Sequence, residues 1–190
     1  MYTFYTLLSH PFVFIGFAKQ ENSSVPIGKS DFNAQWIRQG YGTKALDELK
    51  DKTIICSGTT LGEQVAIVPY LQCMTQQFDT TKCKRKGCDQ GFHNYILYQK
   101  LMKNNNVQGI EKVIVVPQGE GVINNLGILR STLLSELGLY NKDKQLVLNV
   151  DGTVSPVVHQ YDRDAELSEL MRSRLRKMTH EWNDKMGQPN

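Results

Sequence analysis

The sequence predicts an α/β domain in which helices flank a mixed β-sheet. Two short β-branched runs, at 53–56 and 113–116, are typical of buried strands. Longer stretches that begin near Asp31 and Asp89 carry apolar residues at helical spacing. Because strands and helices alternate along the chain before a predicted hairpin, we expect layered α/β packing.

The composition is that of an ordinary globular protein. The 190 residues are 40% hydrophobic and 22% charged, which argues against global disorder. The net charge of +3 is mild and does not by itself indicate a nucleic-acid or membrane partner. The basic cluster at 82–86 lacks interleaved aromatic residues, so we interpret it as a solvated loop and expect no nucleic-acid partner. No apolar run is long enough for a transmembrane helix.

The first 50 residues should contain one strand and two short helices. Segment 1–18 is largely apolar but lacks a basic start, so a buried strand is favoured over a signal peptide. Asp31 can cap a helix that ends at Gly40 and Gly42. A second short helix is expected over 43–50.

The middle of the chain should hold a strand, a turn and a helix. The strand at 53–56 is followed by Ser57-Gly58, which favours a turn. The next helix should run from about 62 to 78, with Pro69 kinking it or marking its first turn. Its predicted apolar stripe comprises Ile67, Leu71, Met74 and Phe78.

A third helix is predicted over 89–102. Asp89 suits its first turn, where the helix dipole and unpaired N–H groups favour a carboxylate. Its predicted core residues are Phe92, Tyr95, Ile96 and Leu101.

The C-terminal part should contain two strands, a hairpin and a long helix. Strands are expected at 113–116 and 122–123. Asp151-Gly152 predicts a type I′ hairpin between strands at 146–150 and 153–159. The last helix should begin near Asp164, so we divide the chain into a domain over 1–163 and a helix with tail over 164–190. The expected stripe of that helix comprises Leu167, Leu170, Met171, Leu175, Met178 and Trp182.

Four cysteines leave the redox state open. Cys83 and Cys88 flank the basic stretch, and a disulfide between them would contribute roughly 2 kcal/mol by constraining the unfolded chain. The alternative is four free thiols in a reducing compartment.

Two polar groups are the candidate sites of chemistry. Asp89 and Gln90 open a helix and can hydrogen-bond to the hydroxyls of a polar ligand, with Asn94 on the same helix face as Gln90. His159 and Asp162 are residue types that suit Mn²⁺ or Zn²⁺. The simpler interpretation is a capping aspartate in each case, with surface polar residues beside Asp89 and a strand-end histidine beside Asp162.

The motifs in order resemble those of a known enzyme family. Three motifs follow one another along the chain: Ile55-Cys56-Ser57-Gly58-Thr59-Thr60-Leu61-Gly62, then Gly87-Cys88-Asp89-Gln90-Gly91-Phe92-His93-Asn94, then Val158-His159-Gln160-Tyr161-Asp162-Arg163. The series resembles the C-terminal half of GT-A-type glycosyltransferases, which transfer a sugar from a nucleotide donor to an acceptor. The resemblance extends over roughly Pro11 to Arg163.

The resemblance assigns a role to six residues. It implies that Asp89 and Gln90 are catalytic and line the donor sugar. It implies that Ser57, Gly58 and Asn94 bind substrate and that His159 is a ligand of Mn²⁺. The implied partners are a nucleotide sugar and a glycan or protein acceptor, in the lumen of the secretory pathway (Golgi).

The chain also departs from this family. The Asp-x-Asp motif that supplies the other metal ligands is not present, and no Asp precedes Asp31. His10-Pro11-Phe12 looks like the segment that follows that motif, so the sequence resembles a partial domain with little activity alone. The alternative function is a non-catalytic carbohydrate-binding or interaction module.

Overall fold

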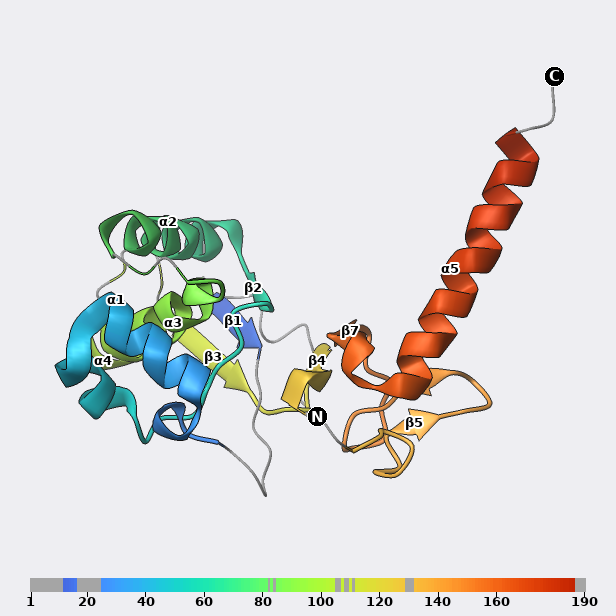
Figure 1. The fold of residues 1–190 in the computed structure, drawn as a ribbon, viewed down its shortest axis with the longest axis horizontal. Coiled ribbons are helices and arrows are strands. Elements are labelled where there is room, and N and C mark those ends of the chain that lie inside the picture. Colours follow the sequence, from blue (N-terminus) through green and yellow to red (C-terminus); the bar gives the residue numbers. More distant parts are fainter. Residues whose placement is uncertain are drawn as a thin grey trace.

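A computed structural model describes most of the chain. The described residues are 12–16, 25–81, 83, 85–104, 107, 110, 112–128 and 132–186. Helices pack around a small sheet, and a long C-terminal helix extends away from the remainder of the molecule (Figure 1). The predicted α/β class is confirmed.

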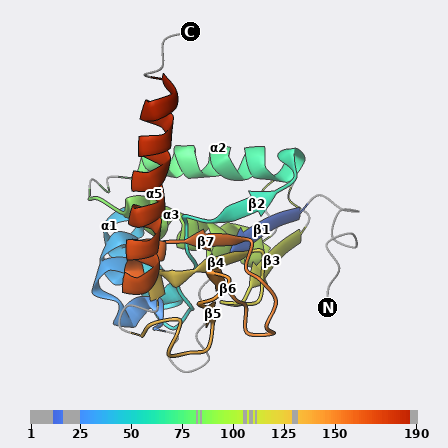
Figure 2. The same cartoon turned by 90° about the vertical axis from the view of Figure 1, so that its right-hand side faces the viewer.

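A mixed three-stranded sheet forms the centre of the described N-terminal part. β1 (Phe12–Gly16) pairs antiparallel with β2 (Thr60–Gly62) and parallel with β3 (Lys112–Val116). Figure 2 shows these three strands side by side. The strands predicted within 1–18 and at 113–116 are confirmed over 12–16 and 112–116; residues 1–11 and 17–18 lie outside the described part.

The strand predicted at 53–56 is wrong. Thr53 forms only an isolated bridge with Pro26, and residues 54–56 are irregular. A side chain replaces the strand partner here. The Ile55 N–H donates to Asn94 Oδ1 at 2.9 Å, and Asn94 Nδ2 donates to the Ile55 carbonyl at 2.9 Å. Because one amide satisfies both buried backbone groups, no ladder is required.

The first helix bends where the glycines predicted a break. α1 (Asp31–Leu49) contains Gly42 at φ 84° and ψ 174°, a conformation that glycine adopts at little cost. The predicted cap is wrong: Ser30, not Asp31, precedes the first turn, and its Oγ accepts from the Asn33 N–H at 3.4 Å. Asp31 lies inside the first turn, where the helix dipole still favours its charge.

The second helix buries a different face from the one predicted. α2 (Gln64–Thr80) buries Ala66, Tyr70, Cys73 and Gln77. Leu71 and Phe78 of the predicted stripe are exposed, whereas Ile67 and Met74 are partly buried. Polar anchors set this rotation, because Tyr70 Oη lies 2.6 Å from His93 Nδ1 and Gln77 Oε1 accepts from the Tyr41 hydroxyl at 3.1 Å. Pro69 lies inside the helix and does not mark its first turn.

The third predicted helix is confirmed. α3 (Cys88–Tyr95) continues as a π-helical segment (Ile96–Leu101) and ends in α4 (Met102–Asn104). Phe92, Ile96 and Leu101 are buried as predicted, and Tyr95 is partly buried and stacks on Tyr41.

The C-terminal part pairs its strands differently from the prediction. β4 (Ile123–Asn125) pairs parallel with β7 (Val157–His159), and β5 (Tyr140–Asn141) pairs antiparallel with β6 (Leu146–Val147). β4 matches the strand expected near 122–123. Three-residue 3₁₀ helices complete the fold, at Ile27–Lys29, Leu126–Ile128 and Tyr161–Arg163.

The predicted hairpin is wrong beyond its turn. Only the bridge Leu148↔Val154 flanks the turn, and the chain then leaves to pair with β4. Gly152 has a φ of 81°, but Asp151 does not have a positive φ, so the turn is not type I′. Asp151 Oδ1 instead accepts from the Thr153 N–H at 2.9 Å, which stabilises a different turn.

α5 (Ala165–Met186) begins where the sequence predicted. Asp164 caps it: its Oδ1 accepts from the Leu167 N–H at 3.0 Å, and its Oδ2 accepts from the Leu134 N–H at 2.9 Å. Leu167 is the one buried residue of this helix, and the rest of the helix projects outward (Figures 1 and 2). No helix among the described residues is long and apolar enough to span a membrane.

Candidate functional site

The start of α3 is held against the segment that precedes β2. Gln90 Oε1 accepts from the Ser57 N–H at 2.9 Å, and Gln90 Nε2 donates to the Ile55 carbonyl. The Ser57 hydroxyl donates to Asp89 Oδ2 at 3.0 Å. With Asn94 also bonded to Ile55, three polar side chains of α3 fix this short irregular segment.

His159 lies against Gly58, the residue that follows Ser57. A Cβ atom at Gly58 would lie 2.6 Å from His159 Nε2 and 3.6 Å from Cys56 Sγ. Only a residue without a side chain leaves room for this imidazole, because 2.6 Å is shorter than any ordinary carbon contact. The β4–β7 pairing delivers the histidine, since Asn125 and His159 are register partners.

The His159 ring has a defined electrostatic environment. Partial burial lowers its pKa, and the Asp162 carboxylate opposes this shift. The imidazole is therefore biased toward its neutral form, in which one ring nitrogen accepts a hydrogen bond or binds a cation.

Cys56 and Asn125 adjoin these residues and were not predicted from the sequence as members of the site. Burial raises the pKa of the Cys56 thiol, while hydrogen bonds with the Gly58 backbone, Thr59 and Asn125 act in the opposite direction. The thiol is therefore protonated at neutral pH and serves as a polar wall of the site. A usable signal was present in the polar pair Asn124-Asn125, which interrupts an otherwise apolar strand and is buried.

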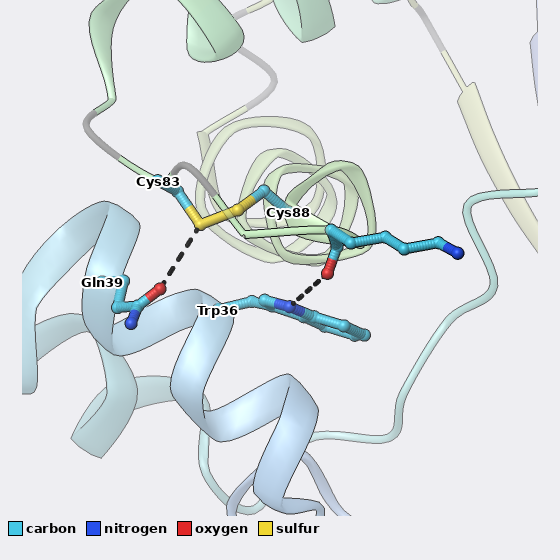
Figure 3. The surroundings of a disulfide bond; sticks show 5 residues. Trp36, Gln39, Cys83 and Cys88 are labelled. Carbon is cyan, nitrogen blue, oxygen red and sulfur yellow. Dashed lines mark hydrogen bonds between the residues drawn. A yellow bond between two sulfur atoms is a disulfide. The ribbon is translucent and has the colours of Figure 1, made fainter.

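A disulfide and a tryptophan fix the N-terminus of α3. Cys83 and Cys88 are bonded, so the disulfide interpretation is the one that the structure adopts, and Figure 3 shows this bond beside Trp36 and Gln39 of α1. Trp36 Nε1 donates to the Lys86 carbonyl at 3.1 Å. Gly87 has a φ of 92°, and a Cβ there would overlap the Trp36 ring. The start of α3, which carries Asp89, is thus tied to α1.

The residues selected from the sequence lie together in the folded chain. We define the candidate site as Ser57, Gly58, Asp89, Gln90 and His159. Asp89 is exposed, and its carboxylate accepts from the Ser57 hydroxyl. Asn94 is 1% exposed and hydrogen-bonds to the backbone of Ile55 and Gln90. It therefore holds the backbone of the site in place and is not accessible to a ligand. The basic cluster beside the site is exposed at Arg85 and Lys86; Lys82 and Lys84 lie outside the described residues.

The described side chains do not by themselves make a metal centre. No group of three or more His, Cys, Asp or Glu residues within the described ranges is arranged to hold a metal ion. Because Mn²⁺ needs several oxygen or nitrogen ligands, His159 supplies at most one of them. We therefore derive no chemical step through Mn²⁺.

Comparison of the chain with protein-family models, with curated proteins and with solved structures gives no match in any of the three.

The candidate site presents an exposed carboxylate, a hydroxyl and an imidazole, held in place by a disulfide-anchored helix start and a strand pair. Such a set can bind the hydroxyl groups of a polar ligand and accept a proton or a hydrogen bond at defined atoms.

Proposed function

We propose that the chain is a glycosyltransferase-like protein whose candidate site binds the sugar of a nucleotide-sugar donor. The observation that carries the proposal is the Ser57–Asp89 and Gly58–His159 juxtaposition. These residues come from three distant segments, and the resemblance to GT-A-type enzymes selected them from short motifs alone. Chance selection of surface polar residues would scatter them over the fold.

The chemistry of the site suits a sugar. Sugar hydroxyls donate and accept hydrogen bonds, and an ionised carboxylate such as Asp89 accepts only. Asp89 Oδ2 already accepts from Ser57, which fixes the carboxylate before a ligand arrives. Preorganised groups lose little conformational entropy on binding, so they contribute more to affinity than mobile ones do.

The proposed roles follow from the contacts of each side chain. Asp89 contacts the donor sugar at its reacting face, and Ser57 and Gly58 border the pocket. Both ends of the Gln90 amide bond to the 55–57 backbone, so its role is to hold Ser57 and Asp89 in register. His159 lies where it can approach the diphosphate of the donor, with Mn²⁺ as the cofactor that the resemblance implies.

Partner and compartment form part of the same proposal. The acceptor is a glycan or a protein, and the compartment is the secretory lumen. The Cys83–Cys88 disulfide supports an oxidising compartment, because structural disulfides persist mainly outside reducing cytosol.

A second function has one observation in its favour. The described residues lack a three-ligand metal cluster, as a carbohydrate-binding module without transferase activity would. Such a module would bind free sugars or glycans through Asp89 and Ser57, with no dependence on nucleotide or Mn²⁺.

Thermal unfolding with and without ligands tests both functions. A ligand that binds only the folded state raises the unfolding midpoint once its concentration exceeds Kd. We expect UDP-sugars with Mn²⁺ to raise the midpoint, Asp89→Asn to abolish that rise, and Asp47→Asn to retain it as the matched control on α1. Loss of the Mn²⁺ effect alone in His159→Ala would support the ligand role of His159.

Two results would count against the glycosyltransferase proposal. An Mn²⁺-independent rise with free sugars that Asp89→Asn removes would favour the binding module. No rise with any UDP-sugar, in a sample that unfolds cooperatively, would contradict the proposed donor site.

A further inference from the structure

The outer part of α5 carries an apolar stripe that nothing in the described structure covers. Leu175 is 56% exposed, Met178 63%, Trp182 64% and Met186 70%. Their spacings of three, four and four residues place them on one face of the helix. Large apolar side chains in such a continuous line are typical of a surface that binds another protein.

The stripe continues the face by which α5 is anchored. Leu167 is buried in a cluster with Leu126, Leu134 and Val147, and Leu170 is partly buried against it. From residue 172 to residue 186 every side chain is exposed. Because an α-helix rises 1.5 Å per residue, these residues form roughly 20 Å of helix. Figure 1 shows this part of α5 projecting from the remainder of the molecule.

The charges along the helix select the partner and its direction. The turn nearest the body is basic, with Arg172, Arg174, Arg176 and Lys177. The outer turns contain Glu181, Asp184 and Lys185, so their net charge is −1. A parallel copy of the helix would place four cations beside four cations. An antiparallel copy instead places the basic turn of each helix at the level of the outer turns of the other, where Glu181 borders the stripe, and it also opposes the two helix dipoles favourably.

We propose that α5 pairs antiparallel with α5 of a second copy of this chain, about a two-fold axis at Met178. Each Met178 then packs against Met178 of the partner subunit. Residues at equal distances on either side of position 178 then face one another. Leu175 lies within one residue of the level of Trp182 of the partner subunit, and Arg174 lies within one residue of the level of Glu181 of the partner subunit. The two bodies then lie at opposite ends of the pair. The contact is isologous and closes at two copies, and it is independent of the proposed function.

Sedimentation of the full chain from roughly 1 to 200 µM tests the pairing, because this range brackets a micromolar Kd. We expect wild type to form a dimer and Met178→Glu to weaken it at least tenfold. Ser173→Glu is the matched control, because it places the same charge on the opposite face of the helix. A chain that stays monomeric throughout overturns the proposal, and so does a dimer that Met178→Glu leaves intact. Circular dichroism shows that each variant is folded.

Cysteine cross-linking tests the direction. A disulfide requires Cα atoms about 4.4–6.8 Å apart. In the antiparallel pair, Met178→Cys meets its own copy and cross-links, whereas Leu175→Cys lies too far from its copy. Equal cross-linking of both variants would show a parallel pair and contradict the proposal. Wild type gives the background from Cys56 and Cys73.

Discussion

Helices α3 and α5 both carry apolar residues at helical spacing, but those of α3 are buried and most of those of α5 are exposed. α3 and the π-helical segment after it contribute Phe92, Ile96 and Leu97 to the core, and the polar side of α3 carries Asp89 and Gln90 of the candidate site. α5 buries one side chain and leaves its apolar stripe exposed. Periodicity therefore shows that a helix face needs a covering surface, and it does not show what covers it.

The difference lies in the connections of each helix. α3 is tied to α1 through the Cys83–Cys88 disulfide loop and Trp36, and to residues 55–57 through Asn94 and Gln90. α5 is held mainly along its N-terminal half, through the Asp164 cap, Leu167 and the contacts of Glu166 with Lys142 and of Arg174 with Gln145. The site can be rigid because its helix has several anchors, whereas the free length of α5 is available to a partner.

Truncating one leucine in the core and one leucine on α5 tests this difference most strongly. Leu97→Ala should lower the free energy of unfolding by about 2–5 kcal/mol, because it leaves a cavity beside Tyr70 and Ile55. Leu175→Ala should change it by less than about 0.5 kcal/mol at concentrations where the chain is monomeric. Urea denaturation measures both values, and equal losses would show that α5 is packed.

Stability should depend on pH, because α3 buries His93. Burial lowers the pKa of His93 from 6.5 to about 4. The unfolded chain therefore binds a proton in a pH range where the folded chain does not, so stability is complete above about 6.5 and falls as the pH approaches 4. We expect a loss of roughly 3 kcal/mol across this interval. Denaturant midpoints from pH 7 to pH 4 measure it, and a flat profile would contradict neutral burial of His93.

The disulfide that anchors α3 has a smaller expected effect. Reduction should destabilise the chain by about 2 kcal/mol, because the short loop between Cys83 and Cys88 no longer constrains the unfolded state. Thermal unfolding with and without dithiothreitol gives the value. The double variant Cys83→Ser with Cys88→Ser should not respond to the reductant, and a response from it would locate the effect elsewhere.

Two glycine substitutions separate site geometry from helix stability. Gly58→Ala should displace His159, since the new Cβ would lie 2.6 Å from Nε2, and it should abolish the midpoint rise with UDP-sugars. Gly40→Ala should keep that rise and add about 0.5–1 kcal/mol of stability, because its nearest neighbours lie 3.8 Å from the new Cβ within α1. Retained ligand response in Gly58→Ala would separate His159 from the site.

Local signals predicted a large part of the fold. Gly42 gave the bend in α1, the run at 113–116 gave β3, and the Asp89 helix start gave α3. The wrong cap at Asp31 and the wrong turn type at Asp151 have local causes, whereas the wrong strand predictions depend on distant partners. Residues 53–56 are irregular because the Asn94 side chain hydrogen-bonds to both backbone groups of Ile55. Val157–His159 pairs with β4 and not with the strand expected across the hairpin. Sequence periodicity contains no information on such pairings.

The candidate site shows the same division. Motif order selected Ser57, Gly58, Asp89, Gln90 and His159, which the structure places together. Cys56 and Asn125 were missed, because their place beside His159 follows from the parallel pairing of β4 and β7. No periodic or spacing signal connects segments more than 30 residues apart in this way.

The central claim is that one site, formed by the 57–58 turn, the start of α3 and the end of β7, binds a nucleotide sugar. Amide chemical shifts of the full chain, recorded during titration with UDP-sugars and Mn²⁺, test it most directly. The claim predicts that the largest changes fall on Ser57, Gly58, Gln90 and His159, and that residues 175–186 of α5 do not respond. Changes confined to α5, or none at saturating ligand, would contradict it.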